Sequence, residues 1–240
     1  MEDVIADAPN AAPEPAAAPA PVGADELAAR LAARLCHDFI SPASAIVSGL
    51  DLLDDPAAKD MRDEAMALIA SSARKLTDLL QFSRVAFGAS AAAESFDSAE
   101  LQRLAQGVFA YGRAELDWAV EPQTLPKPAA RAMLNLVQLA AGALPMGGTA
   151  RVETRRRPQE LLIRVEALGA RVRLYPEVAE GLAGAPLGEG LPGRWVQAFY
   201  LFALVRGAGG QVLVRTGEQS LIMGVVLPEG PAPNGLGGAS

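Results

Sequence analysis

Apolar side chains recur at helical spacing along the chain from residue 24 onward. At about 100° per residue, one face of the first segment, 24–53, collects a single apolar stripe. The stripe consists of Leu31, Leu35, Phe39, Ile46, Leu50 and Leu53. Asp25 stands where a helix cap or first-turn acid is expected. The run Asp54-Asp55-Pro56 then predicts the end of this helix and the start of a second over 56–87.

Two long helices joined by a tight turn predict an antiparallel hairpin. Each helix has a broad apolar face, and a lone hairpin would leave part of both faces in water. Two copies of the hairpin would close a four-helix bundle. We therefore expect residues 24–88 to be a dimerisation hairpin and the protein to be a homodimer.

The periodicity changes after a Gly/Ala/Ser linker at 88–95, which indicates a second domain over 95–228. Helices are expected near 98–109, 128–143 and 192–207, with a short helical piece after Pro176. Strands are expected near 116–120, 149–154, 160–167, 211–216 and 220–227. This mixture predicts a two-layer α/β sandwich, so the fold class of the whole chain is α+β.

Three further segments are expected to be irregular. Residues 1–23 are Ala and Pro with scattered acids, a composition typical of a disordered tail. Residues 229–240 are rich in Gly and Pro and are expected to be flexible. The cluster Arg155-Arg156-Arg157 is expected in a solvated turn between two strands.

Composition narrows the possible partners and compartments. Half of the residues are hydrophobic, which is enough for a sizeable core, and the formal net charge is -7. The negative charge argues against nucleic acid or an anionic membrane as the main partner. No run approaches the ~18 apolar residues of a membrane span, and the acidic start is unlike a signal peptide. We expect a cytoplasmic protein, and its single cysteine fits a reducing compartment.

The chain has one histidine, His37, in the middle of the first predicted helix. It lies about 180° from the centre of the apolar stripe and so should point to solvent. Its neighbours on that outer face are Arg34, Ser41, Ser44 and Ser48, which are mostly short side chains that allow a partner to approach. An incidental helix histidine is the alternative. The adjacent Asp38 can orient or polarise an imidazole, which favours a chemical role.

Two other chemistries fit the sequence poorly. Cys36 and His37 are consecutive on a helix and do not face each other, so they do not make a thiol nucleophile and its base. One histidine and one cysteine also make a zinc site within a single chain improbable.

The pattern HDFISP at 37–42, on a hairpin followed by an α/β sandwich, resembles the dimerisation and catalytic halves of sensor histidine kinases. The second half lacks the chemistry of that family. Leu139 stands where the family places a metal-holding Asn, and leucine cannot ligate Mg²⁺. The family's Asp-x-Gly-x-Gly would fall at 167–171, where there is no Asp. The glycine-rich lid is reduced to 188–193. The scaffold is thus expected to be a degenerate ATPase-like domain.

This combination is similar to the dimeric histidine phosphotransferases of the ChpT type from alphaproteobacterial phosphorelays, and the resemblance covers 24–227. It implies that His37 takes a phosphoryl group from the receiver aspartate of a hybrid histidine kinase and passes it to the receiver aspartate of response regulators. Phosphoryl transfer needs mainly positioning and charge neutralisation. The resemblance implies no cofactor bound by this chain, with Mg²⁺ supplied by the partner receiver domain.

The same resemblance assigns roles to neighbouring residues. Asp38 would hydrogen-bond or polarise the ring, or be only a surface acid. Arg34 would contact the phosphate region of the receiver, or be a solvated helix arginine. Ser41 is short for positioning a water, so little phosphatase activity is expected. The remaining candidates for partner binding are Ile40, Ser44, Val47 and Ser48.

Two alternative functions remain open from the sequence. An ATP-dependent autokinase would need the missing Asn and Asp. A non-catalytic dimeric adaptor for two-component proteins would leave His37 dispensable. The phosphotransfer relay is the favoured interpretation.

Overall fold

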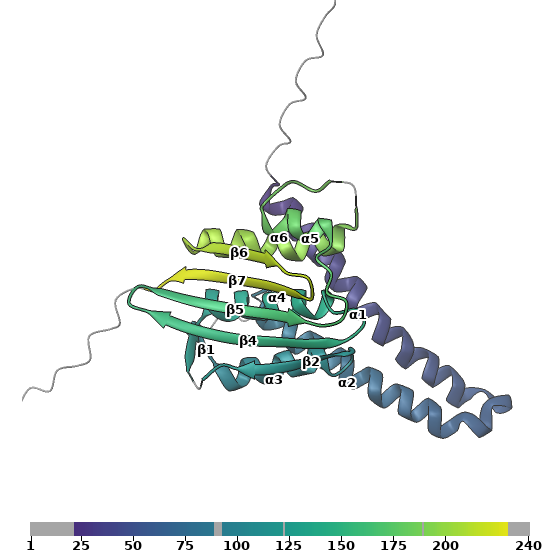
Figure 1. Ribbon diagram of the computed structural model, residues 1–240. Helices are drawn as coiled ribbons and strands as arrows, with labels where there is room; N and C mark the ends of the chain where they lie inside the picture. Colours follow the sequence, from purple (N-terminus) through teal and green to yellow (C-terminus); the bar gives the residue numbers. More distant parts are fainter. Residues whose placement is uncertain (1–21, 89–92, 122, 189, 230–240) are drawn as a thin grey trace, which may run out of the picture.

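A computed structural model describes residues 22–88, 93–121, 123–188 and 190–229 (Figure 1). The chain begins with a long helix α1 (Ala24–Asp54), a 3₁₀ helix η1 (Pro56–Met61) and a second long helix α2 (Arg62–Ala86). The predicted hairpin is confirmed. The N-cap of α1 is Gly23, and Asp25 lies in the first turn of the helix. Nearly all of the two predicted tails, 1–23 and 229–240, lies outside the described residues.

The start of the second helix differs from the prediction. Residues 56–61 form a 3₁₀ helix that is kinked at Ala58, whose φ of −102° and ψ of 24° lie outside the helical region. The Asp55 carboxylate accepts a hydrogen bond from the Ala57 N–H at 2.8 Å, which fixes the turn that begins η1. An α-helix therefore starts only at Arg62.

The second half is built on a five-stranded sheet with the order β2-β4-β5-β7-β6. Its strands are β2 (Ala114–Ala119), β4 (Gly148–Arg157), β5 (Glu160–Leu168), β6 (Gln211–Thr216) and β7 (Ser220–Pro228). β2 pairs with β4 in parallel and the other neighbours pair antiparallel. The helices of this half are α3 (Ser98–Phe109), α4 (Lys127–Gly142), α5 (Pro176–Leu182) and α6 (Pro192–Gly207).

The sheet buries one face against helices. Along β5, buried and partly exposed residues alternate, and its buried side chains Leu161, Ile163 and Val165 join the core. Helix α4 is buried over most of its surface and contacts the sheet at β4, β5 and β7. This is the predicted α+β class with helices on one side of a sheet.

Two details depart from the sequence prediction. Arg155, Arg156 and Arg157 lie at the end of β4 rather than in the turn. The prediction was wrong because the antiparallel pairing of β4 with β5 continues as far as Arg157 and Glu160. The Arg156 side chain also donates to the Glu229 carboxylate and the Gln123 side-chain oxygen. A small antiparallel sheet of β1 (Ser95–Asp97) and β3 (Thr124–Pro126) was not predicted at all. Three-residue strands are too short to show a period.

The hairpin and the second half share one core. Phe82, Val85 and Ala86 at the end of α2 belong to the same buried cluster as the sheet. The amide of the buried Asn135 on α4 donates to the Ala86 carbonyl at 3.0 Å, so it satisfies a carbonyl that the end of α2 leaves unpaired. The division of the chain into two domains at 88–95 stays a prediction, although the end of α2 packs as part of the sandwich.

Helices α5 and α6 cross at a glycine. A methyl group added at Gly181 would lie 2.7 Å from the Ala198 Cβ and 2.7 Å from the Trp195 carbonyl oxygen. Backbone atoms cannot move aside as the end of a flexible side chain can. The two helices therefore pack this closely only because residue 181 is a glycine. The crossing sets the position of the first turn of α6.

We predict that Gly181→Ala lowers the free energy of unfolding by about 1–3 kcal/mol, because the added methyl overpacks the crossing. Urea unfolding followed by circular dichroism measures the change. Gly207→Ala, at the open end of α6 with no atom within 4 Å of the added Cβ, is the matched control and should shift stability by less than about 1 kcal/mol. Equal midpoints for native protein and Gly181→Ala would contradict the prediction.

Candidate functional site

His37 projects into solvent from the middle of α1. Its side chain is 87% exposed. Helix α1 continues without a break through Pro42, which is buried. The residues on the helix face opposite His37 therefore keep their helical spacing. The sequence prediction that the only imidazole of the chain points outward is confirmed.

The Asp38 carboxylate lies between the imidazole and a guanidinium group. Asp38 Oδ1 is 3.4 Å from His37 Nδ1, and Asp38 Oδ2 is 3.5 Å from Arg34 Nε. The carboxylate can accept a hydrogen bond from Nδ1–H, which selects one tautomer and leaves Nε2 as the nitrogen with the free lone pair. Among the described residues, His37 Nε2 has no hydrogen-bond partner.

Arg34 is mostly buried, with 17% of its side chain exposed. It donates a hydrogen bond from Nη1 to the backbone carbonyl of Gly193, at the start of α6. Burial lowers the pKa of the Arg34 guanidinium, and the nearby Asp38 carboxylate opposes that shift. The alternative of a solvated helix arginine is therefore wrong: Arg34 ties α1 to α6.

A groove of about 580 Å³ runs beside His37 between α1 and the first turn of α6. Its second wall includes Leu191, Pro192 and Gly193. The sequence indicated only that these residues belong to the reduced glycine-rich lid at 188–193. Leu191 in this wall is 55% exposed, and nothing in its local sequence marked it as part of the site. The lining residues are Arg30, Ala33, Arg34, His37, Asp38, Leu191, Pro192, Gly193 and Arg194.

The other predicted partner-binding residues form an exposed strip on α1 beyond the groove. Ile40 is 64% exposed and Val47 is 56% exposed. Ser41, Ser44 and Ser48 are exposed as well. The structure thus brings Arg34, Asp38 and His37 together in the groove and places the remaining candidates along the same helix.

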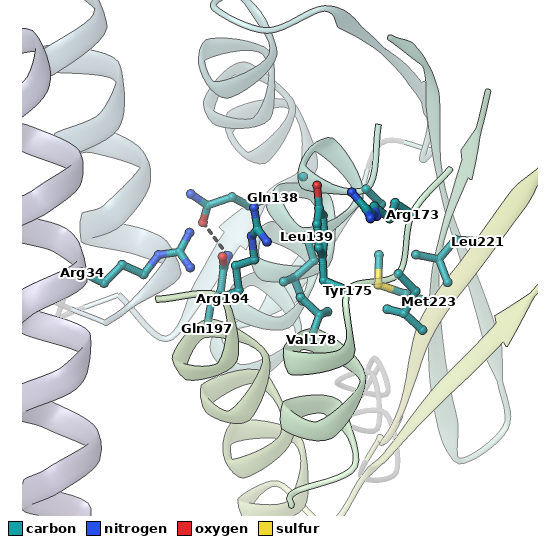
Figure 2. Close-up of a pocket in the computed structure, with 13 residues that line it drawn as sticks. Arg34, Gln138, Leu139, Arg173, Tyr175, Val178, Arg194, Gln197, Leu221 and Met223 are labelled. Atoms are coloured by element: carbon teal, nitrogen blue, oxygen red, sulfur yellow. Dashed lines mark hydrogen bonds between the residues drawn. The ribbon is translucent and has the colours of Figure 1, made fainter. Parts of the chain in front are cut away.

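The position compared above with a metal-holding Asn contains the apolar Leu139, which is 7% exposed. It lines a second cavity of about 180 Å³ behind the groove (Figure 2). Within the described residues, no three His, Cys, Asp or Glu side chains cluster in a way that could hold a metal ion. The helices described are also too short or too polar to cross a membrane.

We predict that Arg34→Met lowers the free energy of unfolding by about 1–3 kcal/mol, because it leaves the Gly193 carbonyl without its donor and the Asp38 carboxylate without its ion-pair partner. Thermal and urea unfolding measure the effect. Arg74→Met, at an exposed position on α2, is the control and should change stability by less than about 0.5 kcal/mol. An Arg34→Met variant as stable as the control would show that the bridge to α6 contributes nothing.

The chain is similar to known phosphotransferases. Residues 98–220 match the family model of the histidine phosphotransferase C-terminal domain. The protein phosphotransferase ChpT of Brucella abortus (strain 2308) is 33% identical over 198 residues, which cover 82% of this chain and 93% of that protein. A bacterial phosphotransferase solved at 1.7 Å is 32% identical with a TM-score of 0.77, over 87% of this chain and all of that one. The chain therefore belongs to the ChpT-type histidine phosphotransferase family.

Proposed function

We propose that this histidine phosphotransferase relays a phosphoryl group through His37. The donor is the aspartyl phosphate on the receiver domain of a hybrid histidine kinase, and the acceptors are receiver aspartates of response regulators. The observation that carries the proposal is the exposed imidazole whose Nδ1 lies against Asp38, on a chain of the phosphotransferase family.

The proposed transfer consists of two successive exchanges of a bond to phosphorus. The Nε2 lone pair of a neutral imidazole forms a bond to phosphorus while the P–O bond to the donor aspartate breaks, which releases its carboxylate. The ring keeps its Nδ1 proton and becomes positively charged, and Asp38 stabilises that charge. In the second half, an acceptor carboxylate attacks phosphorus, the P–N bond breaks and neutral imidazole returns. No net proton is consumed.

The groove supports docking of a receiver domain. His37 stands at its edge, so a partner that fills the groove would contact α1 and Leu191 of the second half together. The exposed strip with Ile40 and Val47 would extend the contact along the helix. The serines in this strip have short side chains, which allow a partner to approach closely. The receiver would supply Mg²⁺ to screen the transferring oxygens, consistent with its family chemistry.

A kinase role has less support. The apolar Leu139 occupies the cavity wall where an autokinase needs an oxygen ligand for its metal. The adaptor alternative predicts the same docking surfaces but assigns no chemistry to His37, so only a transfer assay separates it from the relay.

We predict that His37→Ala abolishes transfer from a phosphorylated receiver, because no other described side chain in the groove is an imidazole. The assay mixes the purified chain with a receiver carrying labelled aspartyl phosphate and follows the label onto the chain and then onto a second receiver. The native protein should become labelled with acid-labile, base-stable phosphate. ATP as the donor should give no label.

Cys36→Ser is the matched control, since Cys36 is exposed next to His37 and also nucleophilic. It should transfer at the native rate. Full relay by His37→Ala would refute the proposal and favour the adaptor, and labelling of native protein from ATP would favour the kinase.

The far half of the hairpin supports the proposed homodimer. It exposes large apolar side chains that a single copy leaves in water, a feature typical of interaction surfaces. They are Leu50 (49%), Met61 (47%), Met66 (51%) and Leu68 (37%). Pairing of two hairpins would bury such a surface in a four-helix bundle.

We predict that native protein sediments as a dimer and that Leu50→Glu converts it largely to monomer, because a carboxylate cannot be buried there without a partner. Sedimentation velocity gives the masses. Ser44→Glu, exposed on the same helix, is the control and should remain dimeric. A monomeric native protein would disprove the dimer while leaving phosphotransfer untouched.

A further inference from the structure

The cavity of about 180 Å³ behind the groove is lined by three arginines. Figure 2 shows Arg34 reaching toward it from α1, while Arg194 and Arg173 approach from α6 and from the segment before α5. Arg173 is exposed, so the cavity is accessible from that side. The site is distinct from the groove at His37, although Arg34 and Arg194 line both.

Two of these arginines stack on one tyrosine ring. Arg194 Cζ lies 3.7 Å from the centre of the Tyr175 ring, and Arg173 Cζ lies 5.0 Å from it. Figure 2 shows the two guanidinium groups on either side of the ring. Stacking uses the flat faces of the guanidinium groups and leaves their N–H edges available, in the fork geometry that matches phosphate and carboxylate oxygens.

Neither stacked arginine has a carboxylate partner within the described residues. No described carboxylate oxygen lies within 4 Å of Arg173 or Arg194. Glu177 is close enough to feel both charges, but its Oε1 accepts the Leu191 N–H at 3.3 Å. Hydrogen bonds from its own backbone and from Leu191 lower the pKa of Glu177 first, and the two arginines add to that effect. The carboxylate is thus held by backbone groups.

The wall behind the arginines is apolar. Leu139, Val178, Leu221 and Met223 line it, and each is at most 8% exposed. Charges interact more strongly next to such a low-dielectric wall than in open water. Two like charges held over one ring beside that wall are therefore costly, and an anion bound at their exposed N–H edges would relieve the cost.

We propose that this cavity binds a small, multiply charged oxyanion of the phosphate class. The guanidinium edges of Arg173 and Arg194 supply the donors, while Arg34 lines the cavity from α1 with its charge already paired with Asp38. The volume sets an upper limit on the ligand: about 180 Å³ lies below the roughly 300–1,000 Å³ typical of pockets for drug-sized molecules. Orthophosphate and pyrophosphate fit that limit, whereas a nucleotide exceeds it.

Isothermal titration calorimetry on the full chain, at constant ionic strength, tests the proposal with orthophosphate, pyrophosphate and AMP as separate titrants. Native protein should give saturable one-site binding with orthophosphate or pyrophosphate and no comparable binding with AMP. Arg173→Gln and Arg194→Gln should each weaken binding at least about tenfold, the loss expected for a charge-assisted contact. Thermal unfolding checks that both variants fold.

Arg215→Gln, an exposed arginine on β6 outside the cavity, is the matched control and should bind like native protein. His37→Ala should also bind normally, which separates this site from phosphotransfer. The proposal is overturned by the absence of saturable binding with either inorganic anion, by native-like binding in both cavity variants, by equal weakening in Arg215→Gln, or by AMP binding as tightly as pyrophosphate.

Discussion

The link between Arg34 and the Gly193 carbonyl joins the two parts of the molecule at the point where its chemistry is proposed. Arg34 lies on α1 one turn before His37. Its side chain donates a hydrogen bond to the first turn of α6 and forms an ion pair with Asp38. One buried guanidinium therefore closes the groove on one side and holds the carboxylate beside the imidazole on the other. An ion pair of this kind in bulk water would contribute little. Here burial makes the loss of either partner costly.

The two ends of the hairpin have different environments. Near the sandwich, Phe82 and Val85 are buried in the common core, and Asn135 satisfies the last turn of α2. Toward the η1 end, Leu50 and Met66 remain exposed in a single copy. The chain therefore has apolar side chains on the hairpin that the shared core does not bury. A bundle of two hairpins needs such a surface on each copy. The proposed dimer surface therefore lies toward the η1 end of the hairpin, whereas His37 lies in the middle of α1 beside α6.

The second half shows how a scaffold can keep its shape while its pocket changes character. Leu139 and Met223 give the cavity an apolar wall, and Arg173, Tyr175 and Arg194 give it a positively charged rim. These residues come from two helices, a loop and a strand that meet at the cavity. The charge favours an anion, while the volume restricts its size. The hypothesis that the nucleotide site is lost leaves room for a different ligand chemistry at the same place in the fold.

The sequence by itself determined the long helices, the strands of the large sheet and the outward direction of His37, because helical and strand periods are local properties of consecutive residues. It also singled out Asp38, which is the next residue along the chain. It failed at the three-residue strands β1 and β3, whose pairing joins segments that are distant in the sequence, and at Arg156, where the pairing of β4 with β5 continues beyond the predicted end of the strand. Only the tertiary structure decided that Arg34 is buried, because its partner Gly193 is 159 residues away. The wall formed by Leu191 and the stacking of two arginines on Tyr175 depend in the same way on how helices pack, which no local period encodes.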